Sequence, residues 1–421
     1  MSYRPKHHLT PPQGRLNDPN GMMLLGNELH VFYQHDPSFP AQPKRTGWGH
    51  AATTLGSGIW RHFPDALYPG APYDVNGCYS GSAVVHDEKI RLFYTGNVKR
   101  DGERLTSQNI VDVDGIEGPM GGTYRRRADN PTIDGPADGY TAHYRDPHVT
   151  QAADGTWRMV LGAQRENHTG AAVLYTSEDL DTWEFAGEIE FVGLGYNTAS
   201  AYMWECPNLL RMRDQATGEV RDVFVFCPQH PDSDECGYVV GTLEGLRFNV
   251  ERDFTPLDYG SEFYAPQLIA DGAGGALMLG WMGLPARDDT PTAAAEGWVH
   301  QLTLVRELSL IDGILSTTLQ IPDPRDMLVE RVDLGSQPWA AELTAGETTC
   351  ATVTWQPDGQ GRGTIAVDVG GLIRWAECAE GELVFTADGA AVECTAGDGE
   401  VAFSCAVFAP GGAGWTALTP K

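Results

Sequence analysis

Five short hairpins recur along the chain at intervals of about 60 residues, and this repeat restricts the fold more than any other feature of the sequence. In each hairpin a polar turn precedes a short aliphatic and aromatic run, which is typical of two antiparallel strands. A repeat of this length built only from strands predicts a propeller, in which each unit is one sheet around a central axis. The five strand-like runs are residues 29–33, 90–94, 157–161, 223–226 and 276–279.

The composition agrees with an all-β fold. The chain holds 50 glycines and 27 prolines, which suit many turns, and apolar stripes at helical spacing are scarce. We therefore expect a five-bladed β-propeller over residues 1–322, followed by a shortened C-terminal β-sandwich over residues 323–421. Alternating apolar and polar residues at 349–355 and 364–369 predict strands in the second domain.

Charge and targeting signals limit the partners. The formal net charge of −28 argues against nucleic acid or an anionic membrane as a partner. Residues 1–8 lack the apolar stretch of an export signal, and the most apolar run, residues 276–284, is too short to span a bilayer. The eight cysteines show no zinc-type spacing. We expect a cytoplasmic protein with reduced thiols and without a metal or cofactor, and the sequence leaves a homo-oligomer open.

A polar cluster stands about seven to nine residues before each hairpin turn, at the same phase of every repeat. Since the first strand of each blade lines the axis of a propeller, the same phase means the same end of that axis. We expect Asp18, Asp146 and Glu205 to converge at one mouth, because each belongs to such a cluster. The other side chains expected to ring this mouth are Tyr79, Ser80, Arg145 and Tyr264.

The first cluster predicts a rigid turn around Asp18. Residues 16–21 read Leu-Asn-Asp-Pro-Asn-Gly, in which Pro19 fixes its own φ and Asn-Gly is a tight-turn pair. A plain turn is the alternative interpretation, since these residues are common turn formers. The carboxylates at equivalent positions of the other repeats favour a site instead.

Aromatic and amide side chains near these carboxylates indicate a sugar site, because sugar rings stack on aromatic faces and polar groups fix their orientation. Gln34 ends the second strand, Trp48 follows the next loop, and Trp281 ends the last hairpin. A solvated strand end for Gln34 and core positions for the tryptophans are the alternatives. The basic run at 125–127 is either a solvated loop or a contact for an anionic group.

With these motifs the chain resembles glycoside hydrolase family 32, the invertase and fructanase family, over residues 5–322. The resemblance implies a five-bladed propeller followed by a β-sandwich. The motifs, in family order, are Asn17-Asp18-Pro19-Asn20-Gly21, Phe32-Tyr33-Gln34, Trp48-Gly49-His50, Tyr79-Ser80-Gly81, Arg145-Asp146-Pro147, Trp204-Glu205-Cys206-Pro207 and Phe263-Tyr264-Ala265-Pro266-Gln267.

The resemblance also implies roles for the carboxylates. It identifies Asp18 as the nucleophile, Glu205 as the general acid/base and Asp146 as the stabiliser of the transition state. Glu205 then has to keep its proton near neutral pH, and Arg145 should keep the neighbouring Asp146 charged. The family positions that line the fructose pocket are matched by Asn17, Gln34, Ser80, Arg145 and Tyr264.

The expected activity is that of a retaining β-fructofuranosidase, which hydrolyses the fructosyl bond of sucrose or short fructo-oligosaccharides. A sucrose-6-phosphate hydrolase and a fructosyltransferase that uses the same carboxylates remain alternatives. For a phosphorylated substrate, Lys44, Arg45 or the 125–127 run would have to offset the negative charge. A sugar-binding protein without activity and an inverting glycosidase fit less well, because all three carboxylates and the family's nucleophile motif are present.

The chain departs from the family in three places, one of which is His35-Asp36 where the family usually has Tyr-Asn. The loop at residues 39–43 holds no tryptophan, although the family usually has one there as a wall of the fructose pocket. This wall is therefore open, or it is supplied by Phe39 or by a partner chain. In addition, the family's closing sandwich strands cannot be found in residues 401–421.

Overall fold

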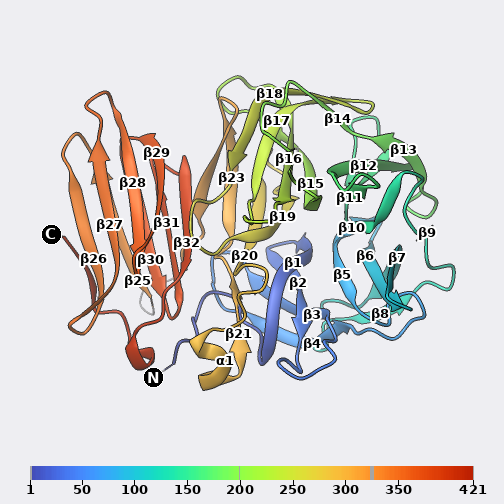
Figure 1. The fold of residues 1–421 in the computed structure, drawn as a ribbon, viewed down its shortest axis with the longest axis horizontal. Coiled ribbons are helices and arrows are strands. Elements are labelled where there is room, and N and C mark those ends of the chain that lie inside the picture. The colour runs from blue at the N-terminus through green and yellow to red at the C-terminus, as the bar shows by residue number, and fades with distance from the viewer. Residues whose placement is uncertain (1, 199, 323–326, 421) are drawn as a thin grey trace.

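The computed structural model describes residues 2–198, 200–322 and 327–420. Figure 1 shows a ring of sheets and, to its left, two further sheets formed by the C-terminal residues. Strands dominate both parts, which confirms the all-β prediction. Among the described residues the helical elements are α1 (Pro291–Glu296) and the 3-10 turn η2 (Pro410–Gly412), and no helix has the length and apolar character needed to cross a membrane.

The ring consists of five sheets, counted over the described residues between 14 and 319. The first sheet contains β1 (Gly14–Leu25), β2 (Glu28–Asp36), β3 (Gly47–Thr54), β4 (Arg61–Leu67) and β21 (Trp298–Val299). The second contains β5 (Cys78–His86), β6 (Lys89–Arg100), β7 (Glu103–Asp114), β8 (Thr123–Arg126) and β9 (Ile133–Asp134). The third contains β10 (Tyr140–Gln151), β11 (Trp157–Arg165), β12 (Gly170–Ser177) and β13 (Glu184–Glu188).

The last two sheets of the ring follow the same plan. The fourth contains β14 (Glu190–Val192), β15 (Met203–Arg213), β16 (Val220–Gln229), β17 (Gly237–Glu244) and β18 (Arg247–Pro256). The fifth contains β19 (Tyr264–Ala270), β20 (Ala276–Met282), β22 (Gln301–Leu302), β23 (Arg306–Ile311) and β24 (Ile314–Leu319). Each sheet therefore includes one of the five predicted hairpins.

The first strands of the five hairpins close the ring. β1, β5, β10, β15 and β19 pack side by side in this order, and β19 returns to β1. The short strand β21 pairs in parallel with the start of β1, which ties the end of the ring to its beginning. The site residues at the same phase of each repeat line one cavity, so they lie at the same end of the ring, as a propeller requires.

Both faces of the inner strands are buried, since each sheet lies between two neighbouring sheets. In β2, Val31 and Tyr33 pack into one core cluster and Phe32 packs into another, as the two-residue period of a strand requires. In β11, Leu161 and Val160 divide in the same way between two clusters. The cores of the ring therefore lie between sheets.

A second ring, made of polar side chains, joins the first strands to one another. In each case a side chain on one first strand accepts a hydrogen bond from a backbone N–H of the next, which satisfies buried amides near the axis. The five pairs are Asn20 with Gly81 (3.1 Å), Ser82 with Val149 (3.0 Å), His148 with Leu209 (3.3 Å), Asn208 with Leu268 (3.0 Å) and Gln267 with Met22 (2.7 Å).

The C-terminal part is a sandwich of two sheets around one core. The first sheet contains β25 (Leu328–Leu334), β30 (Gly381–Asp388), β31 (Ala391–Ala396) and β32 (Val401–Ala406). The second contains β26 (Trp339–Ala345), β27 (Thr348–Pro357), β28 (Arg362–Val369), β29 (Leu372–Ala379) and β33 (Ala417–Pro420). The expectation that residues 401–421 hold no closing strand is wrong, because β32 and β33 complete the two sheets. The predicted domain boundary between 322 and 323 falls where the described residues are interrupted.

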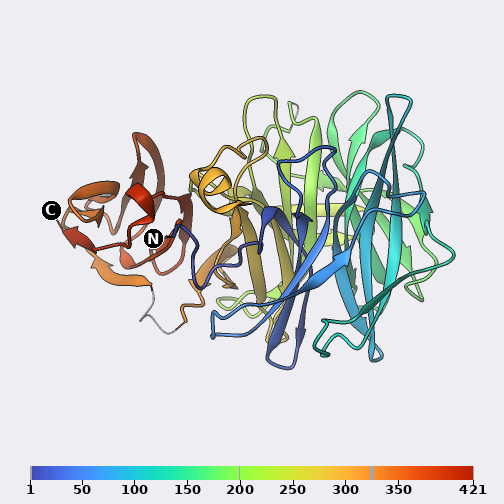
Figure 2. The same ribbon diagram turned by 90° about the horizontal axis from the view of Figure 1, so that it is seen from below.

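Buried charges fasten the sandwich to the ring, with the N-terminal segment between the two (Figure 2). The ring nitrogens of His8 lie 2.9 Å from Asp388 and 3.0 Å from Glu393, and Arg306 contacts Glu393 and Asp258. These five residues are called the interface cluster. Because both imidazole nitrogens face carboxylate oxygens, His8 is an imidazolium. Burial alone would lower the pKa of His8, but its hydrogen bonds to Asp388 and Glu393 raise it to about 9.

Candidate active site

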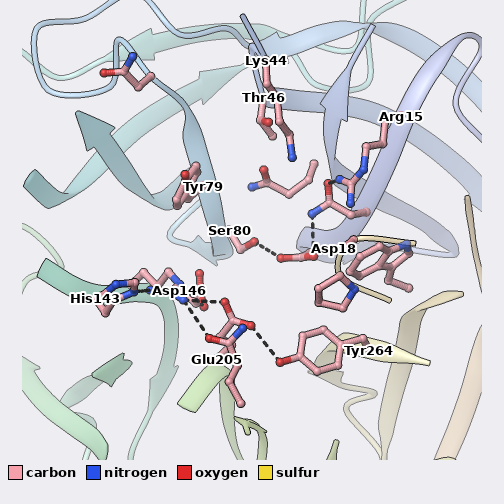
Figure 3. Close-up of a pocket in the computed structure, with 18 of the residues that line it drawn as sticks. Arg15, Asp18, Lys44, Thr46, Tyr79, Ser80, His143, Asp146, Glu205 and Tyr264 are labelled. Atoms are coloured by element: carbon pink, nitrogen blue, oxygen red, sulfur yellow. Dashed lines mark hydrogen bonds and ion pairs between the residues drawn. The ribbon is translucent and has the colours of Figure 1, made fainter. Parts of the chain in front are cut away.

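A cavity of about 690 Å³ opens at one end of the ring axis, and the five polar clusters meet in it (Figure 3). Ten of the eleven residues predicted for the site line this cavity. They are Asn17, Asp18, Gln34, Tyr79, Ser80, Arg145, Asp146, Glu205, Tyr264 and Trp281.

β-Bulges direct the polar side chains into the cavity. The pairing of each first strand with its partner shifts register beside its site residue. At these points Asp146 and Cys206 adopt positive φ values of 66° and 46°. A bulge turns a side chain out of the regular alternation of a strand and is common next to active sites. The five sheets thus use one local device to point different residues at one place.

The stretch around Asp18 is a bulged strand and not the predicted turn. β1 runs without interruption through residues 16–21, with register shifts on both sides of Pro19 and Asn20. Gly21 has a φ of 51°, and a Cβ there would lie 2.7 Å from the Phe32 ring. Turn-forming residues therefore serve here to bend a strand, which holds Asp18 at the cavity.

Two neutral donors hold the carboxylate of Asp18. The Asn17 amide donates to one oxygen at 2.8 Å and the Ser80 hydroxyl to the other at 2.5 Å. Arg15 in turn donates to the side-chain oxygen of Asn17, which fixes the orientation of the amide. Asp18 is thus oriented without a direct ion pair to any side chain that the structure describes.

Glu205 lies across the cavity from Asp18 and is held from two sides (Figure 3). The Tyr264 hydroxyl donates to Oε2 at 2.9 Å, and the Arg145 guanidinium donates to Oε1 at 2.7 Å. Burial first, and then the neighbouring Glu205 carboxylate, raise the pKa of Tyr264 well above its usual range, so the phenol remains a donor. The guanidinium of Arg145 lies 2.7 Å from a carboxylate oxygen of Glu205 and 3.8 Å from one of Asp146, so it pairs more closely with Glu205.

Asp146 is buried at the wall of the cavity, near the other two carboxylates. The backbone N–H of Cys206 donates to it at 3.0 Å, and the Cys206 thiol lies 3.7 Å from both Asp146 and Asp18. Burial raises the pKa of Asp146 to about 7, and Glu205 and Asp18 add to this effect, while Arg145 opposes it. Arg145 favours the charged form of Asp146, as expected, but desolvation outweighs the guanidinium. Asp18, Arg145, Asp146 and Glu205 are called the catalytic cluster.

Trp48 is the predicted site residue that does not line the cavity. Its indole is fully buried behind the wall, where it packs on Phe32 and Tyr94. Its ring N–H donates to the Tyr79 carbonyl at 3.1 Å. On β3 this side chain points between two sheets, so Trp48 supports the strand that carries Tyr79 and does not face a ligand.

The loop that lacks a tryptophan still forms part of the wall. Gln42, Pro43 and Lys44 line the cavity, whereas Phe39 does not, so of the three alternatives for this wall the one with Phe39 is wrong. Lys44 points into the cavity in Figure 3, near Arg15 and Asp18. The wall is therefore polar on this side.

Several further lining residues were missed by reasoning from the sequence, because they lie outside the five clusters. His143, Lys99, Arg104 and Asp288 belong to this group. The Arg145 guanidinium lies 3.2 Å from Nδ1 of His143, which must accept and so leaves the proton on Nε2. The polar residue His143 near the start of β10, two positions before Arg145, was the only feature of the sequence that could have pointed to these lining residues.

Among the described residues no group of three His, Cys, Asp or Glu side chains is placed to hold a metal ion.

Comparison with known proteins places the chain in a family. The model of the glycosyl hydrolases family 32 N-terminal domain matches residues 8–322. The chain belongs to glycoside hydrolase family 32. Curated relatives include sucrose-6-phosphate hydrolases of Bacillus subtilis (40% identical over 73% of this chain and 63% of that protein) and Klebsiella pneumoniae (40% identical over 75% and 66%). The matches thus span less than two thirds of each relative.

Solved structures of family 32 share the fold. A Bombyx mori GH32 beta-fructofuranosidase in complex with sucrose is 29% identical, with a TM-score of 0.80 over 98% of this chain and 90% of that one. A sucrose-6-phosphate hydrolase from Lactobacillus gasseri is 24% identical, with a TM-score of 0.81 over 99% and 92%. The predicted fold class of this family 32 chain, a β-propeller followed by a β-sandwich, is confirmed.

Proposed function

We propose that this protein is a retaining β-fructofuranosidase. The observation that supports it best is the meeting of Asp18, Asp146 and Glu205 in one cavity, each held by different donors. A retaining glycosidase needs one carboxylate to attack and a second carboxyl group to protonate the leaving oxygen. Membership of family 32 and the beta-fructofuranosidase among its structural relatives support the assignment of a fructoside.

The proposed reaction has two steps. Asp18 attacks the anomeric carbon of the fructosyl unit, while Glu205 gives its proton to the oxygen of the leaving sugar, so that the glycosidic bond breaks as an ester forms. In the second step Glu205 takes a proton from water, whose oxygen displaces Asp18 and releases fructose. Asp146 stabilises the positive charge that builds up on the fructosyl ring in both steps.

Sucrose and short fructo-oligosaccharides are the proposed substrates, which the sucrose complex of the Bombyx mori relative supports, and sucrose 6-phosphate is the second candidate. The names of the curated relatives favour the phosphorylated sugar. The charge of the cavity wall also favours it, since Lys44, Lys99 and Arg104 line it in a chain whose net charge is −28. We infer a cytoplasmic location, in agreement with the eight free thiols of the structure.

A product assay tests the proposal. Purified protein is incubated with sucrose, sucrose 6-phosphate, 1-kestose and inulin, and the first fructose released is followed by NMR. Release of β-fructose before mutarotation is expected, together with much faster turnover of the small sugars than of inulin. Initial release of α-fructose would contradict retention. The distance between the carboxyl groups of Asp18 and Glu205 is a second test, since a retaining enzyme requires about 5–5.5 Å and an inverting one about 6.5–9.5 Å.

A further inference from the structure

The hairpin of β6 and β7 carries two cations at the cavity. Both Lys99 and Arg104 line it, and the two residues are direct partners across the hairpin. Like charges directly opposite one another destabilise a pair of strands. A fold that keeps such a pair beside its catalytic cavity indicates an anion that binds between them.

Neither cation has a counter-ion within the described chain. The Arg104 guanidinium lies 5.8 Å from the centre of the Tyr79 ring, and the backbone N–H of Lys99 bonds the Asn76 side chain. Nearby arginines differ, since Arg15 pairs with Asp288 on the same cavity. The chain holds 57 acidic and 29 basic residues, so two adjacent cations without an acidic partner stand out.

The other cations named from the sequence are less suited to hold an anion. Burial and then the neighbouring Arg15 lower the pKa of Lys44, and the carboxylates of Asp288, Asp18 and Asp36 oppose this shift. Arg45 lies over the Tyr68 ring and does not line the cavity. The arginines of the 125–127 run pair with Asp114, Asp74, Asp129 and Asp181.

We propose that Lys99 and Arg104 form a binding site for the phosphate monoester of a sugar phosphate whose fructosyl bond is cleaved in the cavity. The proposal rests on the proposed function. A guanidinium binds two phosphate oxygens with its fork of donors, and an ammonium adds a compact positive charge. Arg104 also acts on the catalytic wall, because after burial and Arg145 it contributes to lowering the pKa of His143 to about 4. Because Lys99 and Arg104 line the same cavity as Asp18 and Glu205, the site adjoins the proposed reacting groups.

Substrate preference tests the site. The ratio of kcat/KM for sucrose 6-phosphate to that for sucrose is measured for the wild type, Lys99→Gln, Arg104→Gln and the double variant. Each substitution removes a charge-assisted hydrogen bond to the phosphate, so the ratio should fall about tenfold in a single variant and more in the double. Arg125→Gln, an exposed arginine outside the cavity, is the matched control and should keep the wild-type ratio. Should the double variant not fold, the single variants decide.

Binding gives a readout that does not depend on turnover. Calorimetry with glucose 6-phosphate, fructose 6-phosphate and the unphosphorylated sugars shows which ring carries the phosphate. Binding of either phosphate that weakens about tenfold or more in Arg104→Gln supports the site, even if the wild type cleaves no fructoside, in which case the proposed function alone fails. A substrate ratio unchanged in the double variant, or sugar phosphates that bind no better than the free sugars, would overturn the site.

Discussion

Two clusters of buried charge in the described part of the chain, the catalytic cluster and the interface cluster, differ in how well their charges balance. Each has three carboxylates. In the catalytic cluster the three carboxylates have one paired cation, the guanidinium of Arg145. In the interface cluster they have two, the guanidinium of Arg306 and the imidazolium of His8. Burial removes water from the carboxylates of both clusters and so raises their pKa values. The number of nearby cations then decides whether the carboxylates stay ionised.

The pKa values follow this difference. In the interface cluster burial raises the pKa of Asp388 and Glu393, but the cations and hydrogen bonds outweigh it and the net shift is downward. In the catalytic cluster burial prevails, and the pKa of Asp146 rises to about 7. A group of three carboxylates with a single paired guanidinium is suited to stabilise a cation, which in the proposed reaction is the developing fructosyl oxocarbenium ion. The interface cluster has its cations built in and serves stability.

The largest expected effect follows from removal of the proposed nucleophile. Asp18→Asn should lower kcat for every fructoside by about 10⁴-fold or more, since no other group can form the ester. The thermal midpoint should not fall, because the substitution removes one charge from a cluster with too many carboxylates. Turnover and thermal unfolding are measured together, with Asp87→Asn on an exposed turn as control. Residual activity above about 1% would show that Asp18 does not attack.

The next effect separates the two other carboxylates. Glu205→Gln should lose about 10²- to 10⁴-fold of kcat on sucrose but much less on an activated aryl fructoside, whose leaving group needs no proton. Asp146→Asn should be impaired equally on both, since charge stabilisation does not depend on the leaving group. The measurement is kcat for both variants on sucrose and on the aryl fructoside. Equal losses for Glu205→Gln on both substrates would remove its role as the acid.

The phase of the repeat allowed the meeting of the carboxylates to be predicted from sequence. Asp18 and Asp146 occupy equivalent bulge positions, and Glu205 precedes the equivalent Cys206, so counting residues from the hairpins was enough. Trp48 was misplaced, because a tryptophan on β3 can face either a ligand or the space between sheets, and period alone does not distinguish the two. The indole of Trp48 lies between the sheets and is fully buried.

Other features carried no local signal. Residues 401–406 are buried at almost every position, so β32 lacks the alternation of apolar and polar residues by which a strand is recognised in a sequence. Lys99 and Arg104 lie in the second half of their repeat and resemble solvated surface cations in sequence. Only the pairing of β6 with β7 brings them together at the cavity. The interface cluster joins residues almost 400 positions apart, which no sequence window contains.

Breaking the interface cluster should cost stability and spare catalysis. Glu393→Gln removes the carboxylate that contacts both His8 and Arg306, and leaves buried positive charge without its partner. We expect a loss of about 3–5 kcal/mol in the free energy of unfolding. Glu382→Gln, which breaks the exposed pair with Arg331, is the matched control and should cost at most about 1 kcal/mol. Urea unfolding measures both variants, and equal losses would show that the buried cluster contributes no more than a surface pair.

The smallest expected effect concerns pH, and it tests whether His8 is charged. The folded pKa of about 9 exceeds the ordinary histidine value of 6.5. The stability that the imidazolium contributes is therefore fully present below pH 6.5 and is lost as pH rises through about 9, and it amounts to about 3 kcal/mol. Measurements start at about pH 5.5, because Asp388 and Glu393 have lowered pKa values and lose their contribution only at lower pH. His8→Gln should unfold well below the wild type at about pH 6, and the gap should close towards about pH 9.5, whereas His86→Gln, an exposed histidine, should follow the wild type. A gap that stays constant across this range would mean that His8 acts through its shape and hydrogen bonds and that the interface cluster is as short of positive charge as the catalytic one.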